Sequence, residues 1–278
     1  MASFDFDQAE GLRRMLQGPR PRVVTFLSAT PEDDKGAMLV NLGASLAQAG
    51  NDVMIIDACQ REHGVARQLE MERHVSLLQV ARQECALNQV VQHAPQGFQV
   101  ATLVRDGLAP QAGSDEARRL AKAFDVLVKG QGGIVIVDGE LGRDGNFAVP
   151  VLAESEIVVQ VSTSAASITN AYALIKRLAQ EFGRRPFGIL VTGASEAEAQ
   201  VVYDNMSQAA SRYLAVTLTS MGSVPADEYL HRAARLGRSV VDAFPLAGAS
   251  VAFRQLAGRF ALPGMAGLAR QGGAQIRL

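Results

Sequence analysis

The stretch "FLSATPEDDKGAMLVNLGASLAQAGNDVMIIDA", residues 26–58, decides the expected fold. An apolar run ends at Ser28, a helical run follows it, and a second apolar run ends at Asp57. The helical run places a leucine every three or four residues, and Gly50 is a residue type that commonly ends helices. A strand, a helix and a strand in this order predict a right-handed βαβ unit with two parallel strands.

The rest of the chain repeats this alternation. Several apolar runs are continuous in Val, Ile and Leu, as is typical of strands covered on both faces. The sequence therefore predicts an α/β fold with a doubly wound, mostly parallel sheet. We expect one domain over residues 22–262, preceded by an amphipathic N-terminal helix and linker (1–21) and followed by a mobile C-terminal tail (263–278). The expected strands are 22–28, 52–57, 98–104, 133–139, 156–162, 187–193 and 213–222.

Composition excludes several classes of protein. The chain has 278 residues, 48% of them hydrophobic, and a net charge of −1, which gives no pull toward nucleic acid or anionic membrane. No apolar run is long enough to span a bilayer, and no signal peptide is recognisable, so a cytoplasmic location is expected. The two cysteines fit no metal spacing, so no metal site is expected. No Gly-x-Gly-x-x-Gly follows the first strand, which argues against a dinucleotide oxidoreductase.

The loop after the first strand is unusual for a phosphate-binding loop. Such loops use glycines, whose backbone N–H groups point at phosphate oxygens, and a Lys-Ser/Thr pair. Here the loop reads "PEDD" (31–34), then Lys35 and Gly36. The proline has no N–H to offer, and each carboxylate would repel a triphosphate by roughly 1 to 4 kcal/mol at about 4 Å. We expect "PEDD" to be a solvated loop or a helix N-terminal cap.

Several stretches together resemble the deviant P-loop family of MinD and ParA, over residues 22–260. They are the stretch quoted above, "GIVIVDGELG" (133–142) and "GSVPADEYLHRAARLGRSVVDAFP" (222–245). "DQAEGLRRM" (7–15) and "SITNAYALIKRL" (167–178) narrow the resemblance to the FlhG/FleN branch, whose members regulate flagellar number. The resemblance implies a MinD-like P-loop NTPase fold.

The resemblance also assigns a remnant nucleotide site. Lys35 falls on the Walker A lysine, Asp57 on the first aspartate after the second strand, and Asp138 on the Walker B aspartate. Two alternatives stay open: Lys35 is a solvated loop lysine, and the two aspartates cap the turns that follow their strands. Cys59 stands where relatives orient water with a second aspartate, and Thr192 where they read adenine with Asn. We therefore expect no catalytic residue and no cofactor.

The N-terminal motif is intact by comparison. In the relatives that it resembles, this motif contacts the signal-recognition-type GTPase FlhF and stimulates GTP hydrolysis. The resemblance implies that Asp7, Gln8 and Ala9 lead that contact and that Leu12 and Arg13 support it. The alternative is a short helix that packs on its own domain.

These observations predict a MinD-like pseudo-ATPase that regulates flagellar assembly through protein contacts. Its expected partners are an FlhF-type GTPase and other flagellar assembly proteins, with no nucleic acid. The rival hypothesis is an ATP-switched dimerising ATPase that binds ATP and Mg²⁺ with an unusual loop. Phe253, Leu256 and Phe260 form one stripe of the last helix, which faces either the core or a membrane; membrane contact is not expected.

Overall fold

The computed structural model describes residues 21–59, 64–71, 75–104, 109–142 and 144–262. Its centre is an eight-stranded sheet with the order β3-β4-β2-β5-β1-β6-β7-β8. Neighbouring strands run parallel, except that β3 is antiparallel to β4. The strands are β1 (Arg22–Ser28), β2 (Val53–Asp57), β3 (Gln92–His93), β4 (Gln99–Thr102), β5 (Ile134–Asp138), β6 (Glu156–Ser162), β7 (Phe187–Thr192) and β8 (Leu218–Val224).

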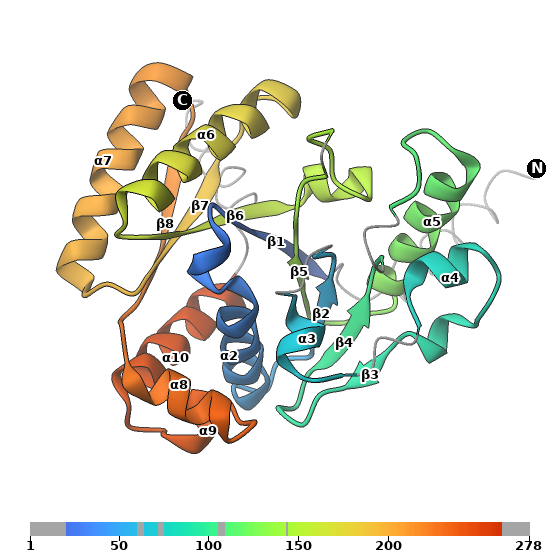
Figure 1. Ribbon diagram of the computed structural model, residues 1–278, viewed down its shortest axis with the longest axis horizontal. Coiled ribbons are helices and arrows are strands. Elements are labelled where there is room, and N and C mark those ends of the chain that lie inside the picture. Colours follow the sequence, from blue (N-terminus) through green and yellow to red (C-terminus); the bar gives the residue numbers. More distant parts are fainter. Residues whose placement is uncertain (1–20, 60–63, 72–74, 105–108, 143, 263–278) are drawn as a thin grey trace, which may run out of the picture.

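Helices cover both faces of this sheet (Figure 1). The helices α4, α5, α6 and α7 pack on one face, and α2, α8, α9 and α10 pack on the other. The described helices are α2 (Lys35–Gln48), α3 (Val65–Gln68), α4 (Leu77–Ala81), α5 (Asp115–Lys129), α6 (Ala165–Glu181), α7 (Glu196–Leu214), α8 (Glu228–Arg235), α9 (Val240–Ala243) and α10 (Gly248–Ala261). The doubly wound, mostly parallel α/β fold predicted from the sequence is confirmed.

Burial follows the sequence pattern. The strands β2 and β5 are buried along their whole length, as their unbroken apolar runs predict. Helix α2 turns its leucines into the core, and Gly50 follows it with a φ of +83°, a conformation that glycine adopts at little cost. The stripe on α10 is buried as well, with Phe253, Leu256 and Phe260 in the core. The core-facing alternative for this helix is therefore the correct one.

Two features differ from the expected pattern. The last strand is not 213–222, because α7 continues to Leu214 and ends with Ala215 in the left-handed conformation. Strand β8 begins only at Leu218. The short strand β3 was not predicted, since two residues carry no periodic signal.

Within the described ranges no helix is long and apolar enough to cross a membrane. The predicted N-terminal helix and C-terminal tail lie outside these ranges.

Candidate functional site

The loop that follows β1 is closed by its own hydrogen bonds. Pro31–Asp33 form a short 3-10 helix, and Asp34 adopts a left-handed φ of 45° before α2 begins. The backbone N–H groups of Asp33 and Asp34 donate to the carbonyl oxygens of Thr30 and Pro31, both at 3.3 Å. At the start of α2, Asp34 Oδ1 accepts from the N–H of Ala37 at 3.4 Å. These donors therefore bond within the protein, whereas an open phosphate cradle would turn such N–H groups toward a ligand.

Asp33 fixes the loop from inside. Its Oδ2 accepts hydrogen bonds from Ser28 Oγ at 3.3 Å, the N–H of Thr30 at 3.2 Å and Ser167 Oγ at 3.0 Å. The residue is only 9% exposed. The sequence predicts that "PEDD" is either a helix N-terminal cap or a solvated loop. The cap is correct for Asp34, whereas the solvated loop is wrong for Asp33, which is buried. Ser167 belongs to α6, so Asp33 ties the loop to a helix far away in the sequence.

Lys35 points back into the sheet. Its Nζ lies 2.7 Å from Asp138 Oδ1 and also donates to the carbonyl oxygens of Phe26, at 3.4 Å, and Gly139. The side chain is 10% exposed and that of Asp138 is fully buried. The solvated-lysine alternative is therefore wrong. This ammonium compensates a buried carboxylate, which is costly to leave without a partner.

Asp57 and Asp138 lie side by side, because they are register partners at the ends of β2 and β5. Asp57 accepts from the N–H of Cys59 at 3.0 Å and from that of Ala66 at 2.9 Å. Asp138 Oδ2 accepts from the N–H of Val65 at 2.9 Å. The structure thus brings all three predicted site residues together, with both carboxylates bonded to backbone donors of the turn or of α3.

Gly64 allows this close approach. A Cβ on Gly64 would lie 2.5 Å from both carboxylate oxygens of Asp57, so a larger residue would force the segment at the start of α3 away. Among the residues that the structure describes, no group of three or more His, Cys, Asp or Glu side chains could hold a metal ion. A Mg²⁺ ion at this site would compete with Lys35 for Asp138 Oδ1 and with the backbone N–H groups that donate to Asp57 and to Asp138 Oδ2.

A groove of about 870 Å³ opens beside the loop, between the start of α2, the ends of β6 and β7, and α8. Gln160 and Thr192 lie in its wall. The Gln160 amide donates to Thr192 Oγ1 at 3.2 Å and to the carbonyl oxygen of Asp33, so it joins groove and loop. Sequence reasoning missed Gln160, although its signal is visible: it is the one polar residue inside the run "IVVQV" (157–161).

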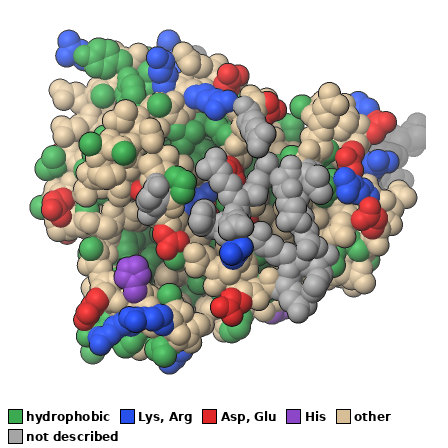
Figure 2. Space-filling model, viewed as in Figure 1, with side chains coloured by type: hydrophobic (Ala, Val, Ile, Leu, Met, Phe, Trp, Pro, Cys, Tyr) green, Lys and Arg blue, Asp and Glu red, His purple; other side chains and the backbone are tan. Residues whose placement is uncertain are grey.

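Charges of both signs lie on this face. Figure 2 shows acidic and basic side chains on the face in view, with a short row of basic ones at its lower left but no long basic stripe of the kind that nucleic-acid binding uses. The groove wall likewise carries both signs, with Asp34 and Glu228 on one hand and Arg235 and Arg238 on the other.

The chain is similar to known proteins in sequence and in fold. No family model matches the chain. The antiactivator FleN of Pseudomonas aeruginosa is 30% identical over 224 residues, 78% of each protein. Among solved structures, the MinD cell division protein of Aquifex aeolicus superimposes with a TM-score of 0.65 at 17% identity, over 87% of this chain and 98% of that one. MinD of Pyrococcus horikoshii, complexed with Mg-ADP, gives 0.64 at 12% identity, over 93% and 100%.

The fold is that of P-loop NTPases of the MinD/ParA type. Within that class, the chain belongs to the FlhG/FleN family.

Proposed function

We propose that this chain is a cytoplasmic, MinD-like regulator of flagellar assembly that acts through protein contacts and does not turn over ATP. Its relative in Pseudomonas aeruginosa is named an antiactivator. The regulatory part of the proposal rests on this family membership. The pseudo-ATPase part rests on the loop after β1.

One observation carries the pseudo-ATPase proposal: the groups that would hold a triphosphate are engaged within the protein. Asp34 caps α2 with its own carboxylate, and Asp33 fixes the loop to α6. Lys35 neutralises Asp138. ATP would have to break these contacts and also approach the carboxylates of Asp33 and Asp34. Opening the loop and placing a triphosphate beside these charges both cost free energy, so both disfavour ATP binding.

Calorimetry with Mg-ATP tests this proposal directly. We expect a dissociation constant weaker than about 1 mM and no detectable phosphate release. As a matched variant, residues 30–36 are replaced by Lys-Gly-Gly-Val-Gly-Lys-Thr, the loop of the relatives. If the native loop is what excludes ATP, this variant should gain affinity. A low-micromolar dissociation constant for the native chain would overturn the proposal.

The second candidate is an ATP-switched dimerising ATPase. The observation in its favour is that Lys35, Asp57 and Asp138 stand together beside a groove large enough for a nucleotide. This candidate requires that the loop opens when ATP arrives. It would require ATP and Mg²⁺ as cofactors, whereas the pseudo-ATPase requires neither.

We further assign the N-terminal motif to contact with an FlhF-type GTPase. Asp7, Gln8, Ala9, Leu12 and Arg13 lie outside the described residues, so this assignment rests on the sequence resemblance and on general chemistry. A glutamine supplied by a partner can orient an attacking water in a GTPase site. Other flagellar assembly proteins are further proposed partners.

A peptide of residues 1–20 should therefore raise the GTP hydrolysis rate of such a GTPase. Gln8→Ala should remove most of the stimulation, because it removes the orienting amide. Leu12→Ala should weaken affinity by about 1 to 3 kcal/mol if that side chain is a buried anchor. If the peptide is inert while the full chain stimulates only with ATP, the ATP-switched candidate replaces this one.

A further inference from the structure

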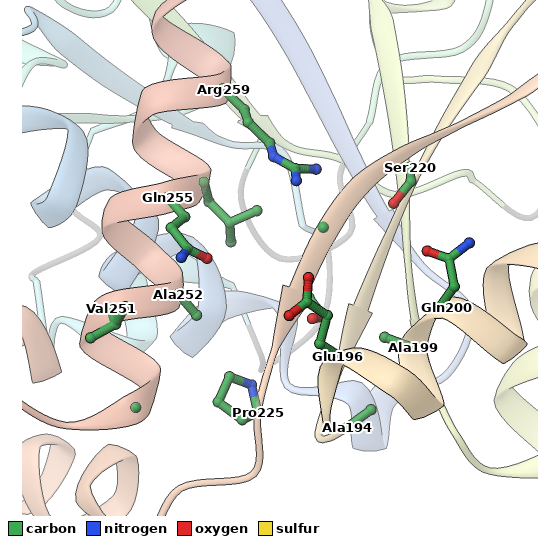
Figure 3. Close-up of a pocket in the computed structure, with 14 residues that line it drawn as sticks. Ala194, Glu196, Ala199, Gln200, Ser220, Pro225, Val251, Ala252, Gln255 and Arg259 are labelled. Atoms are coloured by element: carbon green, nitrogen blue, oxygen red, sulfur yellow. The ribbon is translucent and has the colours of Figure 1, made fainter.

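Strand β8 forms one edge of the sheet and lies at the bottom of a groove. Among the described strands it pairs only with β7. Helix α7 forms one wall of the groove and α10 the other, and the cavity between them measures about 240 Å³ (Figure 3). It is distinct from the loop site, because none of its lining residues belongs to the loop after β1, to α2 or to α3.

The middle of the β8 edge is chemically open to another strand. An edge strand presents unpaired N–H and C=O groups along its free side, and natural proteins commonly guard such edges with charges or proline. The sequence of β8, "LTSMGSV" (218–224), contains neither, and the guards lie at its ends: Pro225 follows the strand, and the Tyr203 hydroxyl donates to the carbonyl oxygen of Leu218 at 3.0 Å. Gly222 lines the groove without a side chain, at a φ of +111°, and the register with β7 shifts between Ile189 and Leu190. This bulge limits pairing to a short segment.

Two opposite charges face this groove and have no partner among the described residues. Glu196, in the first turn of α7, and Arg259, on α10, are both exposed and both line it. Figure 3 shows the two side chains extending from opposite walls toward the space over β8. Neither forms an ion pair or hydrogen bond with any part of the chain that the structure describes. Arg259 lies near Gly222, since its Nη1 is 3.4 Å from the position of a Cβ on that glycine.

We propose that this groove binds an extended segment of a partner protein, which adds a strand to the free edge of β8. The segment carries an acidic side chain opposite Arg259 and a basic side chain opposite Glu196. Main-chain hydrogen bonds supply affinity in this mode of recognition, and the side chains supply specificity. The two charges, which lie on different helices, fix the direction of the segment.

Other occupants fit the groove less well. The cavity is smaller than the roughly 300 to 1,000 Å³ of ordinary small-molecule sites. A second copy of this chain would have to bring its own β8 edge, which lies between the same two helices, so the helix walls would meet before the strands did. A single extended segment has no flanking helices and avoids this clash.

A selection experiment on the full-length protein tests this proposal. Phage-displayed random peptides of about eight residues, long enough for one strand, are selected on the native chain. The pool is then depleted on the double variant Glu196→Arg/Arg259→Glu. Both positions are exposed, so the variant should keep the native circular dichroism spectrum and urea midpoint. The reversal of an exposed lysine on another helix, Lys176→Glu, is the matched control.

We expect enriched peptides that carry one acidic and one basic residue in a constant order. They should bind the double variant about tenfold more weakly than the native chain and should bind Lys176→Glu normally. Their binding should shift the backbone amide NMR signals of residues 218–224, and N-methylation of the peptide backbone should abolish it. The proposal is overturned if no peptides are enriched, if N-methylated peptides bind equally well, or if the double variant binds like the native chain.

The outcome is separable from that of the proposed function. Replacing residues 30–36 by the loop of the relatives should leave peptide binding unchanged, because that loop contributes nothing to this groove. Peptide binding that appears only when ATP is present would instead mean that the groove depends on a nucleotide switch.

Discussion

At the scale of single residues, Asp33 holds the loop after β1 in its closed form. All three of its hydrogen bonds to side chains or loop backbone converge on Oδ2. Asp33→Ala removes this acceptor from the N–H of Thr30 and the Ser167 hydroxyl, whereas the Ser28 hydroxyl can still donate to the carbonyl oxygen of Thr30 at 2.7 Å. The free energy of unfolding should therefore fall by about 1 to 3 kcal/mol in urea denaturation. Asp33→Asn keeps one acceptor oxygen in that position and should lose less. Equal unfolding midpoints for all three proteins would show that this network adds no stability.

Lys35 has a structural task that can be measured without any nucleotide. Lys35→Met leaves the buried carboxylate of Asp138 without its cation, which should cost about 3 to 5 kcal/mol of unfolding free energy. Adding Asp138→Asn removes that charge while keeping an acceptor for the N–H of Val65. The double variant should therefore recover part of the loss. If it is less stable than Lys35→Met, the ion pair is not the reason.

Contacts between residues far apart in the sequence could not be predicted from the sequence. Local chemistry gave a helix cap as one of two alternatives for "PEDD", and Asp34 forms that cap with a neighbouring residue. The burial of Asp33 depends on Ser167, and the ion pair of Lys35 depends on Asp138, each more than 100 positions away. No local pattern reports such contacts. The gathering of Asp57 and Asp138 was predictable only because parallel strands place their carboxyl ends at one edge.

At the scale of elements, the first turn of α7 is held by a reciprocal cap. The Ser195 hydroxyl donates to Glu198 Oε2 at 2.7 Å and its backbone N–H donates to the same oxygen at 2.9 Å. These hydrogen bonds lower the pKa of Glu198 from its ordinary value. The cap therefore stabilises the folded state above the ordinary glutamate pKa, and this contribution is lost as the pH falls through the lowered value.

Ser195→Ala should raise the pKa of Glu198 toward its ordinary value, because it removes the hydroxyl donor. An NMR pH titration of the Glu198 carboxyl group measures this change. Ser195→Thr keeps a hydroxyl and should keep the lowered pKa. An unchanged titration curve in Ser195→Ala would mean that the hydroxyl does not stabilise the carboxylate.

Helix α10 packs its apolar stripe of Phe253, Leu256 and Phe260 into the core, and the contribution of this stripe to stability can be measured. The ring of Phe260 packs 5.6 Å from that of Phe26, and the guanidinium of Arg22 lies 5.2 Å from its centre. Phe260→Ala should therefore cost about 3 to 5 kcal/mol of unfolding free energy. Val251→Ala, at an exposed position of the same helix, should change it by less than about 0.5 kcal/mol. Similar losses at both positions would contradict the assigned face.

Strands were predicted correctly where the apolar run was clear, and the prediction failed where the run was short or also suited a helix. Six of the seven expected strands match the structure to within two residues at each end, because their apolar runs have no helical competitor. The exception is 213–222, where Tyr213 and Leu214 complete α7 instead of starting β8. Tyr213 and Leu214 suit a helix end as well as a strand, so the apolar run alone did not decide between them.

At the scale of the whole molecule, the closed loop bears on assembly. In an ATP-switched protein, bound nucleotide would stabilise a dimer of two copies. The mass of the particle in solution would then depend on ATP. Here we expect light scattering to give the same mass with and without Mg-ATP, because the proposed pseudo-ATPase does not bind ATP through this loop. The variant that carries the loop of the relatives at residues 30–36 is the control. If that loop restores binding, this variant alone should show an ATP-dependent mass. A doubling of mass in the native chain on addition of ATP would show that the closed loop opens, and the ATP-switched ATPase would then be the better description of the molecule.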